Sequence, residues 1–272
     1  MKQRYALSTV LLNGLSLEAA IEKIVGAGFE RVELKGDAGH LDNWIAHPAE
    51  ARRALEAAGI TITTVHSPAA GCNNGSLDEA ARLASVEAAA ASFFQAAEVG
   101  AEAVICHPNV PQPPFTEETF EPIWTRSRKS FVALAERAEA ASIKMAVENL
   151  PARGQPRPGS RISHILAMIE GLGDHVGICL DAGHSNANGM SAAEEVLEAG
   201  EKLFALHIQD NDGQGQDQHL LPGRGTTDWE AFLDALERIG FEGPRTFEVA
   251  RGDEMDVLLA GLSVLRQEWE AR

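Results

Sequence analysis

Hydrophobic and polar positions along the chain follow two alternating patterns. Short apolar runs rich in β-branched residues predict β-strands, and longer alanine-rich amphipathic stretches between them predict α-helices. The expected strands cover residues 5–8, 31–34, 60–66, 103–107, 144–148, 176–181, 204–208 and 246–249. The expected helices cover residues 16–27, 48–58, 77–99, 118–141, 160–171, 191–200, 228–239 and 254–269.

This order of elements predicts an α/β protein with a single (β/α)8 TIM barrel, with an open doubly wound sheet as the alternative. No Pro/Ser-rich linker or block of charge interrupts the series, so residues 1–272 are expected to form one domain. In such a barrel, residues at the carboxyl ends of all strands face one central mouth. Chemistry is therefore expected where the strands end.

Histidines and carboxylates gather at these expected strand ends and in the loop after the seventh strand. They are His66, His107, Glu148, Asp181, His184, His207, Asp217, His219 and Glu248. A lone histidine there is more often structural than a ligand, but this many together favour a divalent metal ion. Without a cation, the carboxylates would repel one another and raise each other's pKa. Mixed imidazole and carboxylate ligands suit zinc, manganese, iron or cobalt better than calcium.

The segment around Asp181 has a pattern of its own. An apolar run ends in Asp181, and Gly183 and Asn186 follow it, which favours a strand that enters a loop. A helix cap or a solvated loop is the alternative explanation of the Asp-x-x-His spacing between Asp181 and His184.

Composition narrows the partners and the compartment. The chain has 23 Lys+Arg against 40 Asp+Glu, and its formal net charge of -17 disfavours general attraction to nucleic acid or anionic lipid. No apolar run approaches about 18 residues and the N-terminus has no long apolar region, so we expect a cytoplasmic protein without a membrane span. Cys72, Cys106 and Cys179 show no paired spacing and are expected to be reduced and mostly buried.

Several short motifs together resemble the xylose isomerase-like TIM barrel superfamily, which includes sugar and sugar-phosphate isomerases and epimerases and the endonuclease IV type of abasic-site nuclease. The motifs are Val65-His66-Ser67-Pro68, Cys106-His107-Pro108, Val147-Glu148-Asn149, Leu180-Asp181-Ala182-Gly183-His184, Leu206-His207-Ile208-Gln209-Asp210, Pro222-Gly223-Arg224-Gly225 and Phe247-Glu248.

The resemblance implies that Glu148, Asp181, His207 and Glu248 hold one divalent ion, such as Mn, Zn, Co or Mg. It also implies that Glu148 and Glu248 move protons through a metal-stabilised enediolate of a sugar or sugar-phosphate substrate. His184 is expected to hydrogen-bond the substrate oxygen that develops charge, and a supporting role in the loop is its alternative.

One detail of the resemblance divides the possible activities. The 3-epimerases usually carry an arginine before the Pro-Gly-x-Gly loop, where this chain has Asp217-Gln218-His219. Instead His66, His107, Asp217 and His219, together with His184 and the four core ligands, match the nine-ligand, three-metal pattern of the endonuclease IV type. These four residues are therefore candidates for further metal or substrate binding.

The acidic charge and the lack of basic loops interleaved with aromatic residues argue against a nuclease. A metal-dependent isomerase or epimerase is therefore the preferred interpretation. The alternatives are an abasic-site phosphodiesterase, a sugar-derived dehydratase or lyase, and a metal or sugar binder without catalysis.

Residues 149–161 form the one locally basic stretch near the expected mouth. Arg153, Arg157 and Arg161 are candidates to bind a phosphate or carboxylate of the substrate, and a solvated loop is the alternative. Arg224 is a fourth candidate, in a turn whose backbone N–H groups could cradle an anion, with a simple tight turn as the alternative. The alanine-rich stretch 77–99 is expected to pack on the barrel, with a homo-oligomer surface as the alternative.

Overall fold

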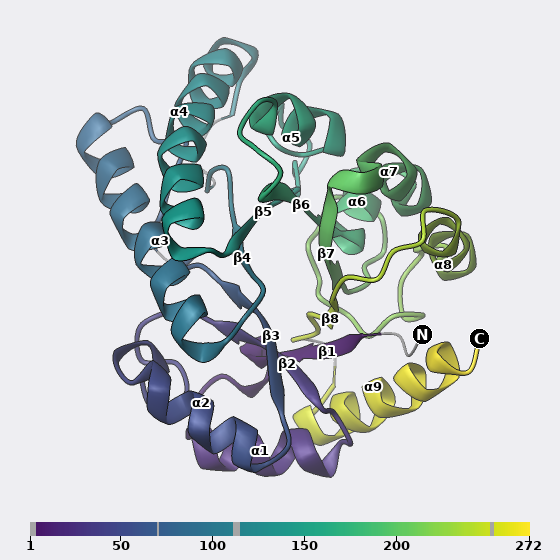
Figure 1. Cartoon of the computed structure of the whole chain (residues 1–272). Helices are drawn as coiled ribbons and strands as arrows, with labels where there is room; N and C mark the ends of the chain where they lie inside the picture. Colours follow the sequence, from purple (N-terminus) through teal and green to yellow (C-terminus); the bar gives the residue numbers. More distant parts are fainter. Residues whose placement is uncertain (1–3, 70, 111–114, 251–252) are drawn as a thin grey trace.

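Eight parallel strands close into a barrel in the computed structural model, which describes residues 4–69, 71–110, 115–250 and 253–272 (Figure 1). Each strand pairs with its neighbours in chain order, and β8 returns to β1. The strands are β1 (Tyr5–Ser8), β2 (Arg31–Lys35), β3 (Thr61–His66), β4 (Ala103–Cys106), β5 (Lys144–Glu148), β6 (Val176–Asp181), β7 (Leu203–Ile208) and β8 (Arg245–Phe247). The expected (β/α)8 TIM barrel is confirmed, and an open sheet is excluded.

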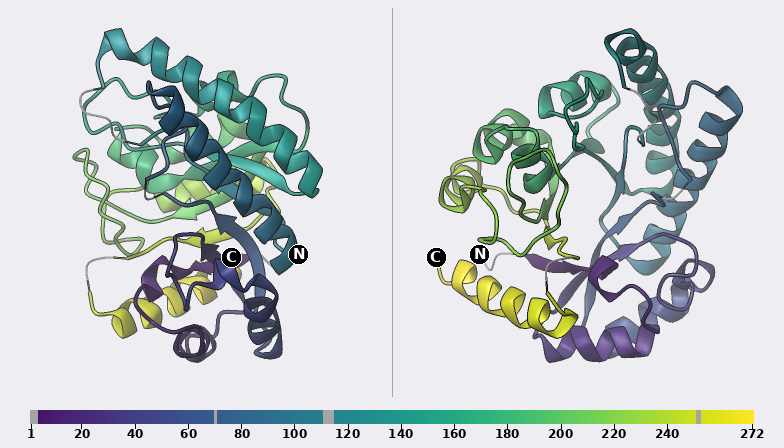
Figure 2. Two further views of the ribbon diagram at one scale, coloured as in Figure 1. Left: turned by 90° about the vertical axis from the view of Figure 1, so that its left-hand side faces the viewer. Right: turned by 180° about the vertical axis from the view of Figure 1, so that it is seen from behind.

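The helices surround the strands on the outside of the barrel (Figures 1 and 2). They are α1 (Leu17–Gly26), α2 (Pro48–Ala57), α3 (Glu79–Val99), α4 (Glu117–Ala141), α5 (Ile162–Ile169), α6 (Ala182–Ala187), α7 (Ala192–Ala199), α8 (Trp229–Arg238) and α9 (Met255–Glu270). Three short 3-10 segments accompany them, η1 (Thr9–Leu12), η2 (Trp44–Ala46) and η3 (Gly200–Lys202). Every expected helix and strand is present with ends that differ by at most two residues.

Side-chain caps fix several of these helix starts. Ser16 accepts the backbone N–H of Ala19 at the start of α1, and Asp228 accepts that of Ala231 at the start of α8. A side-chain oxygen at this position satisfies an N–H group that has no partner within the helix. The local sequence therefore determines where these helices begin.

The main hydrophobic core lies between the strands and the helix ring, while a small cluster fills the barrel interior. The interior cluster consists of Ile105, Ala146, Cys179 and Ala205. Cys106 and Cys179 are buried as expected, whereas Cys72 is partly exposed. The small interior residues leave the space above them, at the carboxyl ends of the strands, to polar side chains.

Irregularities in strand pairing change which side chains face the interior. Between β2 and β3 the register shifts, so that Val32 pairs with Ile62 but Glu33 pairs with Thr64. Because side chains alternate along a strand, the extra residue in β3 reverses the inward side and lets His66 point to the mouth. An equivalent shift between β6 and β7 precedes His207.

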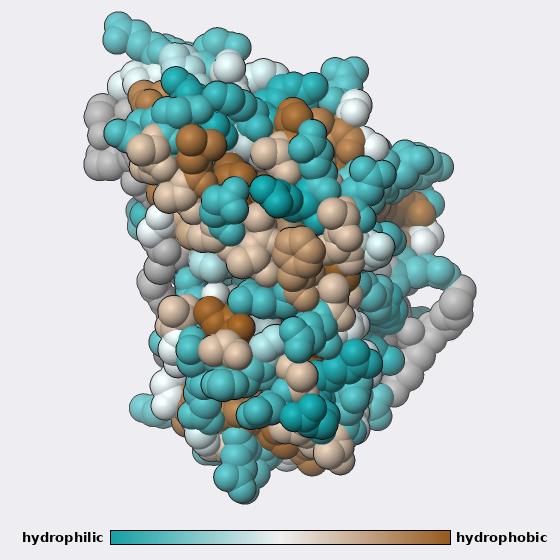
Figure 3. Space-filling view, turned by 60° about the vertical axis from the view of Figure 1, so that its left-hand side comes forward, coloured by the Kyte–Doolittle hydropathy of each residue, from teal (hydrophilic) through white to brown (hydrophobic). Residues whose placement is uncertain are grey.

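The outer surface of α3 is partly apolar. Phe93 is buried against the barrel, as expected for this stretch, whereas Leu83 and Phe94 are about half exposed. Apolar side chains gather on this side of the molecule, over α3 and α4 (Figure 3). Whether this surface joins two copies of the chain stays a prediction. No helix in the described ranges is long and apolar enough to cross a membrane.

Candidate active site

The structure gathers the expected ligands at the carboxyl ends of the strands. Glu148 ends β5, Asp181 ends β6, and His207 lies next to last in β7. Strand β8 ends one residue before Glu248, rather than beyond it as expected, so this glutamate lies directly after the strand. These four side chains are nearly or completely buried, and one ligand atom from each lies within 4.8 Å of those of the others.

Distances within this four-residue group fit the shell of a metal ion. His207 Nδ1 lies 3.1 Å from Glu148 Oε1 and 3.1 Å from Glu248 Oε2. Ligand atoms at about 2.1 Å from one ion and at right angles to each other are separated by about 3 Å. Asp181 Oδ2 is buried and has no hydrogen-bond partner, which a cation would relieve. The residues present therefore fit a divalent ion.

A second group lies beside the first and shares Glu148 with it. His107 Nε2 lies 3.0 Å, and His66 Nε2 3.4 Å, from Glu148 Oε2. The Nδ1–H of His66 donates to the backbone carbonyl of Ser67 at 2.7 Å. This bond leaves the Nε2 lone pair of His66 facing the group, as metal ligation requires.

A third group consists of His184, Asp217 and His219. The Nε2 atoms of His184 and His219 lie 3.4 and 3.1 Å from the Asp217 carboxylate. Both histidines donate Nδ1–H to a backbone carbonyl, His184 to that of Asn149 and His219 to that of Glu248, each at 2.8 Å. All nine residues singled out at the strand ends and in the loop after β7 thus lie in three adjoining groups.

Shifted pKa values report the excess of negative charge in this site. Burial lowers the pKa of His184, but the Asp181 and Asp217 carboxylates outweigh burial and raise that pKa to about 10. Burial likewise lowers the pKa of His219, and Asp217 and Glu248 raise it to about 9. Burial raises the pKa of Asp181 to about 7. Groups that favour protons this strongly also favour a metal cation.

The segment after β6 is a helix, not the expected loop. Asp181 caps α6, because its Oδ1 accepts the backbone N–H of His184 at 2.7 Å. The cap interpretation of Asp181 is confirmed for Oδ1, and metal binding through Oδ2 stays a prediction. A six-residue helix is too short for a periodic pattern, which is why the sequence did not reveal it.

Several polar residues support the ligands and were not singled out from the sequence. Asn149 Oδ1 accepts the backbone N–H of Asp181 at 2.7 Å. Gln209 Nε2 donates to the carboxylates of Asp181 and Asp217 at 3.2 and 3.0 Å. Glu33, in β2, accepts a hydrogen bond from His207. The sequence signal for Glu33 was its place between the apolar Val32 and Leu34. Parallel strands of a barrel are buried on both faces, and a glutamate is rarely buried without a partner.

The loop after β7 is built around Asp210, which is fully buried. Asp210 Oδ2 accepts the backbone N–H groups of Gly223 and Gly225 at 2.8 and 3.0 Å and the indole N–H of Trp229 at 3.1 Å. The expectation that these backbone N–H groups cradle an anion is therefore wrong, because a carboxylate of the chain already occupies them.

The four arginine candidates differ in their surroundings. Arg157 is buried and donates to Asn109 Oδ1, Pro151 O and Asn109 O, between 2.8 and 2.9 Å. Arg153 and Arg161 are exposed, and the exposed Arg224 lies 3.9 Å from Asp253. Arg157 thus ties the loops after β4 and β5 together, and substrate binding by the four arginines stays a prediction.

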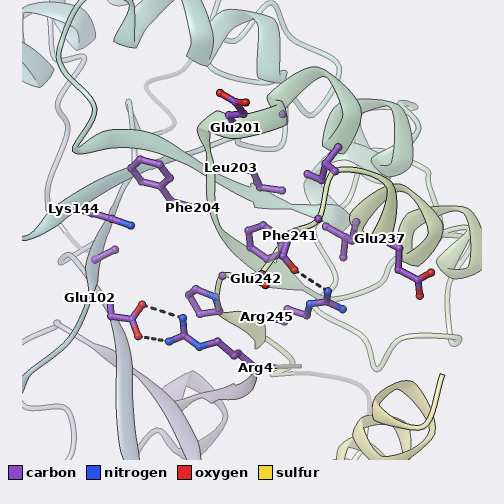
Figure 4. Close-up of a pocket in the computed structure, with 17 residues that line it drawn as sticks. Arg4, Glu102, Lys144, Glu201, Leu203, Phe204, Glu237, Phe241, Glu242 and Arg245 are labelled. Carbon is purple, nitrogen blue, oxygen red and sulfur yellow. Dashed lines mark hydrogen bonds and ion pairs between the residues drawn. The ribbon is translucent and has the colours of Figure 1, made fainter. Parts of the chain in front are cut away.

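A cavity of about 800 Å³ lies at the other end of the barrel, where the strands begin (Figure 4). Its described lining includes Arg4, which pairs with Glu102, and Arg245, which donates to the backbone carbonyl of Phe241 at 3.3 Å. None of the described residues that line it is a candidate ligand. Its size does not make it the active site, because the convergent ionisable groups lie at the opposite end.

Comparison with known proteins agrees with this architecture. A protein designated MJ1311 from Methanocaldococcus jannaschii is 26% identical over 254 residues, which cover 91% of this chain and 84% of that protein. The crystal structure of a D-tagatose 3-epimerase-like protein superposes with a TM-score of 0.82 at 24% identity, covering 98% and 97% of the two chains. That of the 3-keto-D-glucoside 4-epimerase YcjR from E. coli superposes with a TM-score of 0.81 at 20% identity, covering 98% and 100%.

The sequence model of one family matches residues 21–268, which is most of the chain, and it describes a xylose isomerase-like TIM barrel. The match includes the strand-end motifs and all three groups of ligands. The chain therefore belongs to the family of xylose isomerase-like TIM barrels.

Proposed function

We propose that this protein is a divalent-metal-dependent isomerase or epimerase of a sugar or sugar phosphate. One observation carries the proposal: Glu148 and Glu248 both lie 3.1 Å from His207 Nδ1, so two carboxylates flank one ion position. Proton transfer beside a carbonyl needs this combination of a cation and two groups that move protons. The 3- and 4-epimerases named among the structural relatives support the reaction class.

The residues take distinct roles in this reaction. Glu148, Asp181, His207 and Glu248 would hold the ion, which supplies Lewis-acid polarisation of the substrate carbonyl. The Glu248 carboxylate, whose pKa falls to about 2 because His207 outweighs the effect of burial, is ionised at neutral pH and can accept a proton. One glutamate removes the proton from the carbon beside the carbonyl, and the other returns a proton to give the product. His184 would donate a hydrogen bond to the substrate oxygen that develops charge.

Isotope exchange and metal removal test this proposal together. The enzyme should incorporate solvent deuterium at the carbon next to the carbonyl of its substrate, in a panel of free and phosphorylated sugars. Chelation should abolish this exchange, and manganese or cobalt should restore it. Full activity of exhaustively demetallated protein would contradict the metal requirement, and no exchange into any sugar would contradict the reaction class.

The exposed arginines near the mouth support an anionic substrate. Arg153 and Arg161 are exposed, and each could form a charge-assisted pair with phosphate worth about 1.5–3 kcal/mol. Replacement of either by alanine should raise KM for a phosphorylated sugar about tenfold and leave the free sugar unchanged. An equal change in KM for both sugars would instead support the interpretation of this segment as a solvated loop.

One observation favours a second candidate, a phosphodiester hydrolase. The nine candidate ligands fall into three groups, two of which share Glu148, and several metal ions can hold a water nucleophile and a phosphate leaving group. The net charge of -17 opposes DNA binding. Nicking of an abasic duplex that is lost in His219→Ala, without deuterium exchange into any sugar, would establish the hydrolase instead. A cytoplasmic location and a homo-oligomer remain predictions for either enzyme.

A further inference from the structure

Glu33 is a completely buried carboxylate inside the barrel, in contact with the proposed ligand His207. Its Oε2 accepts a hydrogen bond from Thr64 Oγ1 at 2.8 Å and lies 3.0 Å from His207 Nε2, and its Oε1 lies 3.4 Å from Ser8 Oγ. The register shift between β2 and β3 places Thr64 beside Glu33. Such a shift commonly redirects a side chain toward a functional site.

Burial of a carboxylate is costly unless a partner compensates it. Among the described residues, Glu33 forms an ion pair with His207 and with no lysine or arginine. A structural role alone would be met more cheaply by an apolar side chain that fills the same volume. We therefore expect the Glu33 carboxylate to serve a function beyond packing.

His207 offers that use, since its two ring nitrogens face different partners. Nε2 faces Glu33, whereas Nδ1 faces Glu148 and Glu248, each 3.1 Å away. Glu33 Oε2 accepts from Thr64 Oγ1, and His207 Nε2–H is the second donor that faces this oxygen, so Nε2 carries the ring proton when Nδ1 binds a cation. The lone pair of Nδ1 is then directed at the ion position between Glu148 and Glu248.

We propose that Glu33 is a positioning residue, which fixes the tautomer and ring orientation of His207 and thereby strengthens metal binding by the four-residue group. The inference rests on the proposed function, because it takes His207 as a metal ligand. Carboxylate partners of ligating histidines raise the basicity of the imidazole and contribute to metal affinity.

Three histidines of the other two groups have a backbone carbonyl where His207 has a carboxylate partner. His66, His184 and His219 each donate Nδ1–H to a backbone carbonyl, which is neutral, and present Nε2 to their group. His207, by contrast, contacts a carboxylate outside the set of candidate ligands, that of Glu33. The four-residue group is therefore expected to bind its ion most tightly of the three.

Metal affinity tests the role of Glu33 without measuring activity. In a His66→Ala/His219→Ala background, which removes one ligand from each neighbouring group, Co²⁺ affinity is measured by calorimetry. Glu33→Gln keeps the shape and an accepting oxygen but removes the charge, and should weaken Co²⁺ binding about tenfold. Glu33→Leu removes the acceptor as well, and should weaken binding roughly 10- to 100-fold and change the visible absorption bands of bound Co²⁺.

Proton-detected ¹⁵N spectra of the Zn²⁺-loaded protein supply the second readout. They should show a strongly hydrogen-bonded Nε2–H of His207, assigned by its loss in His207→Gln, and in Glu33→Leu this proton should shift upfield and exchange faster with solvent. Glu195→Gln is the matched control, because Glu195 is also a buried glutamate but accepts the backbone N–H of Ile162, at the start of α5. It should change neither the Co²⁺ affinity nor the spectrum.

The outcomes separate this inference from the proposed function. Unchanged Co²⁺ affinity and an unchanged His207 Nε2–H resonance in a folded Glu33→Leu protein would overturn the role of Glu33 and leave the enzyme proposal standing. A chain with Glu33 intact that binds no Co²⁺ at this group would overturn both. Where Glu33→Leu fails to fold, Glu33→Gln decides, since it preserves the packing.

Discussion

Asp181 uses its two carboxylate oxygens for different purposes. Oδ1 accepts the backbone N–H of His184 and the amide N–H of Gln209, at 2.7 and 3.2 Å, and so fixes the start of α6. Oδ2 is buried and has no hydrogen-bond partner, although His184 Nδ1 lies 3.6 Å away. A buried oxygen without a partner is costly, so its persistence beside three other ligand residues is strong structural support for a cation at this point.

Replacement of Asp181 by asparagine should separate these purposes. Asp181→Asn retains an oxygen for the helix cap but puts an NH₂ group, which is no metal ligand, in the place of Oδ2. We expect Co²⁺ affinity to fall roughly 100-fold, or about 2.7 kcal/mol, while the fold is retained. Calorimetry and circular dichroism measure the two effects. Asp228→Asn, at the matching cap of α8, should leave affinity unchanged, and wild-type affinity in Asp181→Asn would remove Asp181 from the ligand set.

At the scale of elements, the loop after β7 depends on one buried side chain. Asp210 Oδ2 accepts from Gly223, Gly225 and Trp229, and Oδ1 accepts from Thr227 Oγ1 at 2.9 Å. The same loop carries two ligand candidates, which Asp210 therefore positions without touching them.

Removal of this hub should loosen the loop. Asp210→Ala leaves several donors unsatisfied, and we expect the free energy of unfolding to fall by about 2–4 kcal/mol. Denaturant titration measures that change, and hydrogen exchange should show faster exchange at the N–H groups of Gly223 and Gly225. Asp212→Ala, an exposed substitution in the same loop, should cost less than about 1 kcal/mol. An equal loss of unfolding free energy in both variants would contradict the central role of Asp210 in this loop.

A second link joins α7 to α5. Glu195 is buried in α7, and its Oε2 accepts the backbone N–H of Ile162 at 2.8 Å. Burial raises the pKa of Glu195 from its ordinary 4.5 to about 7. The folded state therefore favours the protonated carboxyl more than the unfolded state does. This contribution to stability is complete below about pH 4.5 and is lost as the pH rises through about 7.

Glu195→Gln should remove this pH dependence, because glutamine is neutral at every pH. The variant and the wild type should have similar Tm at pH 5, and the variant should be more stable at pH 8, by up to about 3 kcal/mol. Thermal unfolding at both pH values measures the difference. Glu194→Gln, its exposed neighbour, should show no such trend, and a difference that shrinks with rising pH would contradict the assignment.

At the scale of the whole molecule, barrel closure brings into one site residues that are far apart in the sequence. Glu33 and His207 are separated by 174 positions and lie 3.0 Å apart. The proposed ion position therefore depends on residues of β5, β6 and β7, on the residue after β8, and on Glu33 of β2 through its contact with His207. An ion bound there stabilises only the folded state, since the unfolded chain scatters these ligands.

Metal removal should consequently lower the stability of the entire barrel. At a free Co²⁺ concentration of about 100 times Kd, binding adds about 2.7 kcal/mol. For a protein of this size, that corresponds to a rise in Tm of roughly 5–10 °C. Differential scanning calorimetry with Co²⁺ and with excess EDTA measures the shift. Asp181→Asn should show little of it, and an identical Tm of the wild-type chain in both solutions would exclude a tight metal site.

The sequence by itself determined the architecture and the places of the main candidate ligands at the strand ends. Hydrophobic periodicity and capping residues such as Ser16 act over a few neighbouring positions, so the strands and long helices could be predicted from local patterns. Strand order then followed from the regular alternation of elements. Glu148, Asp181 and His207 could be predicted as site residues because each lies at the carboxyl end of a strand, which the barrel directs to one mouth.

Only the tertiary structure decided which partners these buried polar residues contact and which way their side chains point. The bulge that turns His66 inward, the pairing of Glu33 with His207 and the capture of the Gly223 N–H by Asp210 all depend on register between segments distant in the sequence. Helix α6 starts on a residue that also faces the ion position. Local sequence encodes periodicity and caps, whereas partners of buried charges are chosen when the barrel closes and removes them from water.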